Sequence, residues 1–175
     1  GYACIYALND VTDYELDRKR MGELPREQAC FDLDCIFVRH PLAQGFITFA
    51  GGMAWTAMWG LIALVGAALL NPVCGAIFIV GAILEVIYCK FYGYSQWKII
   101  IAATVKNLGG LAAIYAVNPD PPLEFIMIVF IWIAFWEVGG QNIPNDLVDM
   151  DEDRRLGGKT IPVVYGTNLS VLIVL

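Results

Sequence analysis

The sequence predicts an all-α fold, a bundle of several membrane-spanning helices. Hydrophobic residues make up 58% of the 175 residues, and charged residues only 16%. With a mean hydropathy of +0.62, the chain has more apolar surface than a soluble domain of this length can bury. Long apolar runs with few charges are also what a helix needs to cross the roughly 30 Å hydrocarbon core of a bilayer. The expected medium is therefore the membrane.

The boundaries of the spans follow from charges and helix breakers. The first run contains no charged residue, and the second begins after Asn71 and Pro72, which favour a tight turn. The third run is interrupted by Lys106 and Asn107, and the fourth follows the breaker 118–122, which holds three prolines. The predicted spans are 46–70, 73–89, 97–117 and 123–140.

Both ends of the chain resemble parts of further helices. The apolar segments 1–8 and 168–175 are each long enough for about two helical turns. No signal peptide is visible, because the chain lacks a starting Met and a charged entry to an apolar run. We expect residues 1–175 to be a single-domain fragment of a larger membrane protein, truncated at both ends.

One acidic pattern occurs twice. Residues 9–17 read Asn-Asp-x-x-Asp-x-x-x-Asp, and residues 145–153 repeat this pattern 136 positions later. Carboxylates are costly to keep in so apolar a chain unless they bind a cation. The alternative is a solvated acidic loop that pairs with its own basic neighbours. Those neighbours are Arg18, Lys19, Arg154 and Arg155.

The two motifs are expected on the same side of the membrane, because four crossings separate them. Basic residues support one orientation: ten of the eleven Lys and Arg fall on or beside the loops of that side, and the eleventh is Lys106. The positive-inside tendency makes this side cytoplasmic. The ten are Arg18, Lys19, Arg20, Arg26, Arg39, Lys90, Lys98, Arg154, Arg155 and Lys159.

The spacing within each motif suits magnesium. If each motif is helical, residues four apart share one face, so each motif presents two or three oxygens together. Mg²⁺ prefers oxygen ligands and is typically held by one or two carboxylates, waters and substrate phosphates. The predicted metal ligands are Asn9, Asp10, Asp13, Asp17, Asp149 and Asp153, with Asn145 and Asp146 linked to the metal or a diphosphate.

Together with the four spans, these motifs resemble the UbiA prenyltransferase superfamily. The tail 153–162 and the segment 40–45, His-Pro-Leu-Ala-Gln-Gly, add to the resemblance. It implies about nine helices around a lipid-open cavity, with both motifs binding Mg²⁺ and a polyprenyl diphosphate. Asn9 and Asp13 fit the first family motif, and Asp149 and Asp153 the second. The sequence departs from the family where His40 replaces an arginine and where the stretch 21–38 is longer.

The implied reaction breaks an allylic carbon to oxygen bond, so negative charge builds on the departing diphosphate. Metal ions and lysines can offset that charge. The candidates for catalysis are Asp13, Asp149 and Lys106, and those for diphosphate binding include Lys159 and Lys90. Lys106 lies within a span, where a lysine costs about 3 kcal/mol by insertion scales. It is expected to face a polar cavity; alternatively it snorkels or pairs with Glu85.

Aromatic side chains can line the path of the prenyl cation. The candidates for this wall include Tyr88, Tyr115, Trp132 and Trp136, whereas Tyr92, Tyr94 and Trp97 are expected in an interfacial belt.

The sequence thus predicts a Mg²⁺-dependent integral membrane prenyltransferase acting on a polyprenyl diphosphate. The acceptor is expected to be hydrophobic, most commonly an aromatic quinone precursor, and the location a bacterial or archaeal plasma membrane. Two alternatives are a CDP-alcohol phosphotransferase-like enzyme and a cation transporter lined by acidic residues. Partners would include membrane lipid but no nucleic acid, since a net charge of −6 provides no basic footprint.

Overall fold

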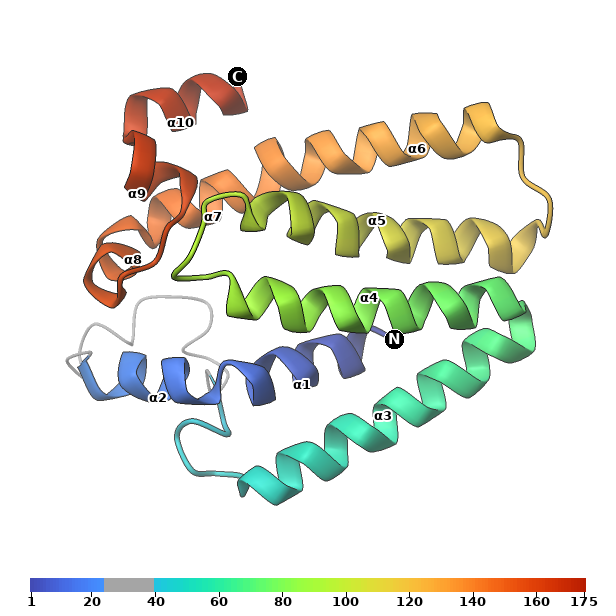
Figure 1. The fold of residues 1–175 in the computed structure, drawn as a ribbon, viewed down its shortest axis with the longest axis horizontal. Helices are drawn as coiled ribbons and strands as arrows, with labels where there is room; N and C mark the ends of the chain where they lie inside the picture. Colours follow the sequence, from blue (N-terminus) through green and yellow to red (C-terminus); the bar gives the residue numbers. More distant parts are fainter. Residues whose placement is uncertain (24–39) are drawn as a thin grey trace. The chain divides into compact units, whose positions relative to one another are not determined.

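The computed structural model describes residues 1–23 and 40–175 (Figure 1). Within these ranges the chain is helical and contains no strand, which confirms the all-α prediction. Arg26, Arg39 and most of the 21–38 stretch lie outside the described residues. The chain forms two compact units, Gly1–Leu61 and Ile62–Leu175.

The first unit holds α1 (Tyr2–Thr12), α2 (Tyr14–Glu23) and the first part of α3 (Phe49–Leu70). A sulfur contact joins α1 to α3, where Cys4 Sγ lies 3.7 Å from the carbonyl oxygen of Thr56. The turn before α3 is held by Leu42, which is only 3% exposed. A Cβ added at Gly52 would lie 3.0 Å from Leu42 Cδ1, so the turn packs closely against α3 at this glycine.

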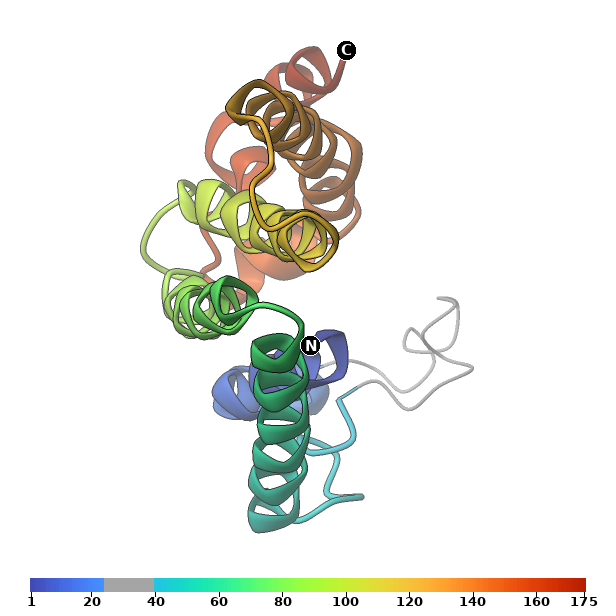
Figure 2. The ribbon, with the colours of Figure 1, turned by 90° about the vertical axis from the view of Figure 1, so that its right-hand side faces the viewer.

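The second unit contains the rest of α3 and all later helices. Helices α4 (Pro72–Lys90), α5 (Lys98–Val117) and α6 (Leu123–Phe135) lie side by side, with α5 between the other two in both views (Figures 1 and 2). Asn71 stabilises the turn into α4, since its Oδ1 accepts from Val73 N and its Nδ2 donates to the Tyr115 carbonyl. This side chain therefore both caps α4 and ties its start to the end of α5.

After α6 the chain passes through a π-helix and a series of short helices. These are η3 (Trp136–Asn142), α7 (Ile143–Val148), α8 (Met150–Leu156), α9 (Ile161–Tyr165) and α10 (Thr167–Val174). A small apolar core joins this region to the start of α5. It consists of Ile99, Ile143 and Ile161, with Val138 and Leu147 packed against it.

Four helical stretches are long and apolar enough to cross a membrane: Phe49–Leu70, Pro72–Lys90, Lys98–Val117 and Leu123–Val148. In the most apolar 18 residues of each stretch, between 0% and 28% of the residues are buried. Large apolar side chains such as Leu61 (64% exposed) and Trp132 (68% exposed) point outward. These surfaces match lipid rather than water. The first three predicted spans agree with the helices to within three residues at either end, whereas the fourth helical stretch extends eight residues past the predicted 140.

Candidate functional site

The first acidic motif bends the chain at Asp13. Helix α1 ends at Thr12 and α2 begins at Tyr14, while Asp13 adopts φ −93° and ψ 6° between them. The helical hydrogen bonds nevertheless continue through the bend, because Asp13 N donates to Asn9 O (2.8 Å) and Asp17 N donates to Asp13 O (2.9 Å). Thr12 Oγ1 also donates to the Leu8 carbonyl, a contact that often bends helices.

The second motif has the same bend at the equivalent residue. Helix α7 ends at Val148 and α8 begins at Met150, while Asp149 adopts φ −90° and ψ 5°. Asp149 N donates to Asn145 O (3.0 Å), and Asp153 N donates to Asp149 O (2.8 Å). The helical path that the four-residue spacing assumes is thus interrupted at one residue in each motif, although the backbone hydrogen bonds four residues apart persist through it. Each motif is two helices joined at its central aspartate, in the sparsely populated bridge region where many active-site residues lie.

Burial also follows the repeat. The last aspartate of each motif is buried, with Asp17 2% exposed and Asp153 3% exposed. The central aspartates, Asp13 and Asp149, are partly exposed. Each motif thus has an anchored carboxylate at its end and an accessible one at its bend.

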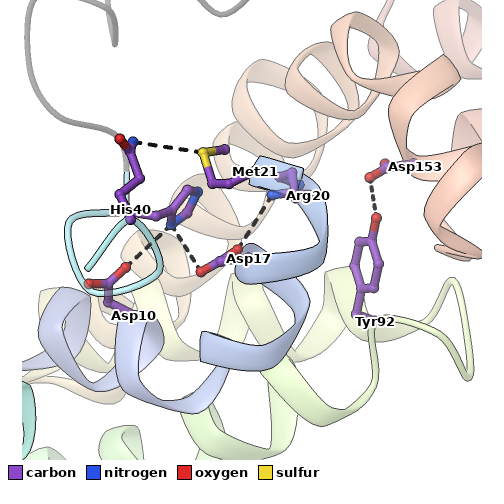
Figure 3. A network of polar contacts seen from close by, with 8 residues as sticks. Asp10, Asp17, Arg20, Met21, His40, Tyr92 and Asp153 are labelled. Atoms are coloured by element: carbon purple, nitrogen blue, oxygen red, sulfur yellow. Dashed lines mark hydrogen bonds and ion pairs between the residues drawn. The ribbon is translucent and has the colours of Figure 1, made fainter. Parts of the chain in front are cut away.

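The carboxylates of the first motif face the turn that precedes α3. His40 Nδ1 lies 3.3 Å from Asp10 Oδ1 and 2.9 Å from Asp17 Oδ2 (Figure 3). Arg20 Nη1 lies 3.9 Å from the other oxygen of Asp17. Asn9 is partly exposed in α1. The structure therefore brings two of the proposed ligands, Asp10 and Asp17, together beside a histidine.

The second motif faces the start of α5 and the loop before it. Tyr92 donates a 2.7 Å hydrogen bond from its hydroxyl to Asp153 Oδ1 (Figure 3). Lys98 is only 7% exposed, and its Nζ lies 5.0 Å from the centre of the Tyr92 ring and 5.4 Å from that of Tyr88. Such distances favour a cation–π interaction.

Asp146 links this lysine to the motif. It interacts electrostatically with Lys98, Asp149 and Asp153, and it is partly buried in α7. Asn145, by contrast, is exposed. The second motif therefore gathers three carboxylates beside one buried ammonium group.

The other predicted lysines are placed differently. Lys106 Nζ lies 3.9 Å from Glu137 Oε1, and Glu137 is 4% exposed. Asn142 Nδ2 donates to both the carbonyl and the Oε1 of Glu137, 3.0 Å each, across the turn of η3. Lys90 is exposed at the end of α4. Lys159 is exposed too, and its backbone N–H donates to the Tyr92 carbonyl.

Three residues of this region were missed by the sequence reasoning. Lys98 was counted only as a loop cation, Tyr92 was counted only as an interfacial aromatic, and Glu137 was given no role. A lysine at the first position of an apolar helix, six residues after a tyrosine, was the available signal. Spacing alone did not show that both side chains turn toward the second motif.

Both motifs carry the carboxylates that divalent cations bind, and among the described residues it is Asp10, Asp17 and His40 that bring three donor atoms within 4.8 Å of one another. The second motif offers only oxygens, from Asp146, Asp149 and Asp153, which is the set that Mg²⁺ prefers. The first motif offers oxygens too, and Asp17 Oδ2 is buried without a hydrogen bond. The first motif belongs to the unit Gly1–Leu61 and the second to Ile62–Leu175, so their joint grip on one ligand stays a prediction.

The fold and these motifs define the chain as an integral membrane protein with two matched acidic sites. It belongs to the UbiA prenyltransferase family, whose model matches residues 1–175. The resemblance seen in the motifs is thereby confirmed along the whole chain.

Three curated proteins are similar to the chain. It is 24% identical over 182 residues to the digeranylgeranylglyceryl phosphate synthase of Methanosphaera stadtmanae, covering 99% of this chain and 59% of the relative. The synthase of the same name from Methanococcus aeolicus is 27% identical, with coverage of 93% and 51%. The 4-hydroxybenzoate octaprenyltransferase of Shewanella halifaxensis is 26% identical, with coverage of 94% and 52%.

The chain thus spans between 51% and 59% of the length of these curated relatives. No solved structure matches it significantly.

Proposed function

We propose that the chain forms the diphosphate-binding part of a membrane prenyltransferase, which transfers a polyprenyl group from its diphosphate to a hydrophobic acceptor. The observation that carries this proposal is the repeated motif, with the same bend at Asp13 and Asp149 and the same buried final aspartate. Family membership favours this activity over a CDP-alcohol phosphotransferase or a cation transporter. The mostly apolar exposed surface of the spans suits a lipid-soluble donor.

Asn9, Asp10, Asp13 and Asp17 would hold a divalent cation on one side, and Asn145, Asp146, Asp149 and Asp153 on the other. Bound Mg²⁺ would offset the charge that develops on the departing diphosphate. The central and the final aspartates of each motif would have different roles in binding the metal. The partly exposed Asp13 and Asp149 present oxygens at the bends, while the buried Asp17 and Asp153 fix the orientation of each motif.

Cationic side chains would complete the diphosphate site. Lys98 is the best placed, because it is buried beside Asp146 and held over two aromatic rings. An ammonium group in such a site stabilises phosphate oxygens more than it would in water. Lys159 and Lys90, both exposed, would contact the diphosphate from the mouth of the site. Lys106 is already paired with Glu137 and would act deeper in the span.

The acceptor is proposed to be an aromatic quinone precursor, with a glyceryl phosphate lipid as the second candidate. Both kinds of chemistry occur in the names of the relatives. The acidic motifs are proposed to face the cytoplasm, because the basic residues gather on their side of the spans.

The proposal is tested with the full-length protein in membranes, supplied with radiolabelled polyprenyl diphosphates of several lengths. The acceptor panel contains 4-hydroxybenzoate, dihydroxynaphthoate and prenylated glyceryl phosphate, each with Mg²⁺ or with excess EDTA. We expect Mg²⁺-dependent release of diphosphate and a labelled lipid product with one acceptor class. Donor hydrolysis or transfer that persists undiminished in EDTA would contradict the metal assignment. No product with any acceptor would contradict the proposed activity.

Gly158→Ala should lower transfer by about tenfold, the lower end of the effect of disturbing residues that orient metal ligands. A Cβ at this position would lie 2.6 Å from Tyr92 Cζ and 2.7 Å from its hydroxyl oxygen. The ring must move, and the 2.7 Å hydrogen bond to Asp153 is then lost. Gly109→Ala is the control, because a Cβ there meets nothing within 4 Å. Equal initial rates of the two variants would show that the tyrosine does not position Asp153.

A further inference from the structure

One imidazole nitrogen in the first unit faces two carboxylates of the first motif. His40 is the single histidine among the 175 residues. Its Nδ1 lies 3.3 Å from Asp10 Oδ1 and 2.9 Å from Asp17 Oδ2, and these three donor atoms all lie within 4.8 Å of one another (Figure 3). The histidine comes from a turn 23 residues beyond Asp17, so the cluster is not a by-product of helical spacing.

The two contacts of Nδ1 differ in kind. The contact with Asp10 has the geometry of a hydrogen bond. Asp17 Oδ2 is closer, yet it makes no hydrogen bond, and the Asp17 side chain is only 3% exposed. Arg20 approaches only the other oxygen, Oδ1, at 3.9 Å. A buried carboxylate oxygen that accepts no hydrogen bond is destabilising, so a further partner is expected to satisfy it.

The spacing of the donor atoms suits a metal ion. Two ligands at about 2.1 Å from a cation and 90° apart lie about 3.0 Å from each other. The separations of 2.9 Å and 3.3 Å bracket this value. A cation held by Nδ1, in the tautomer that leaves this nitrogen without a proton, would also satisfy Asp17 Oδ2, which accepts no hydrogen bond.

The turn holds the imidazole in place. His40 has φ 51°, a left-handed conformation that is uncommon outside glycine, and Gln44 N donates to its carbonyl oxygen at 3.1 Å. The buried Leu42 anchors the same turn. The side chain is thus presented to the motif by an ordered backbone, as a preorganised ligand requires.

We propose that Asp10, Asp17 and His40 form a mixed nitrogen and oxygen site for a first-row transition metal dication, with Mn²⁺ as the test ion. Carboxylates alone suit Mg²⁺ and Mn²⁺, whereas an imidazole ligand shifts preference toward the transition metals. The inference deepens the proposed function, on which it rests in taking Asp10 and Asp17 as metal ligands. It adds His40 as a ligand and a metal preference that an all-oxygen motif would not have.

The test uses the full-length protein, purified with a tag that contains no histidine, stripped of metal and loaded with Mn²⁺. Pulsed electron paramagnetic resonance detects the ¹⁴N coupling of an imidazole bound to Mn²⁺. We expect this coupling in the wild type and in Gln44→Ala, a control in the same turn, and its loss in His40→Gln. Mn²⁺ affinity should fall at least about tenfold in His40→Gln, since even residues outside the ligand shell cost 10- to 100-fold. Mg²⁺ affinity should change less.

His40→Arg separates a ligand from a mere counter-charge. Arginine keeps a positive charge near the two carboxylates but does not ligate metal. We expect this variant to bind Mn²⁺ as weakly as His40→Gln. Wild-type affinity in His40→Arg, or Mn²⁺ bound to the wild type without ¹⁴N coupling, would overturn the site. Mg²⁺-dependent prenyl transfer without ¹⁴N coupling would support the proposed function and overturn the His40 metal site. Coupling without any prenyl transfer would support the metal site and contradict the proposed function.

Discussion

Asp13→Asn and Asp149→Asn are each expected to reduce prenyl transfer by at least about 10²- to 10³-fold, the loss typical of removing one electrostatic contact to the reacting group. These aspartates occupy matching bends, φ −93° and ψ 6° against φ −90° and ψ 5°. Asparagine tolerates the same backbone conformation, so the substitution removes the charge while leaving the bend in place. The measurement is the initial rate of labelled product formation by the full-length protein in membranes.

Asp151→Asn is the matched control for this pair. Asp151 lies in α8 at a position of the second motif that is not part of the repeated pattern, and its side chain is 85% exposed and pairs with Arg154 at 3.4 Å. An exposed ion pair of this kind contributes little to stability. We expect this variant to transfer prenyl groups at the wild-type rate. The metal assignment is wrong if Asp13→Asn or Asp149→Asn is as active as Asp151→Asn while all three variants insert into the membrane equally.

Lys98→Met should lower kcat/KM for the prenyl diphosphate by about 10²-fold, because it removes an ammonium group from a site largely closed to water. Lys98 is 7% exposed and interacts with Asp146. Methionine fills a similar volume, but it leaves that carboxylate without its cation, so a lower melting temperature is also expected. Both quantities are measured on the purified full-length protein.

Lys19→Met serves as the control, because Lys19 is exposed in α2. It should leave both kcat/KM and melting temperature unchanged. If Lys98→Met raises KM for the prenyl diphosphate more than KM for the acceptor, Lys98 contacts the diphosphate. Equal rises in both would indicate a structural role, and an unchanged kcat/KM would rule out the proposed contact.

Much of the fold follows from sequence pattern alone, because the signals involved are local. A run without charges from Phe49 to Leu70 and a turn signal at Asn71 and Pro72 depend only on neighbouring residues. The repeat of Asn9 to Asp17 at Asn145 to Asp153 also shows in the sequence without a structure. These observations were sufficient for the fold class and for the family.

The bends and the partners of the carboxylates depend on tertiary contacts, which local pattern does not contain. Nothing in the sequence around Tyr92 shows that its hydroxyl meets Asp153, 61 residues later. His40 was read as a departure from a family arginine, and only the folded turn shows it against Asp10 and Asp17. The fourth apolar stretch was predicted to end at 140, whereas the helix continues through the π-helical segment Trp136–Asn142 to Val148.

That change of helix type has a geometric consequence for the second motif. A π-turn accommodates one more residue than an α-turn, so everything after Asn142 is rotated about the axis by the equivalent of one residue, about 100° for an α-helix. Straightening Trp136–Asn142 by deleting a single glycine would swing Asp146 and Asp149 roughly a quarter-turn away from their present heading. The extra residue in η3 therefore sets the direction in which the polar residues of α7 face relative to the apolar residues of α6.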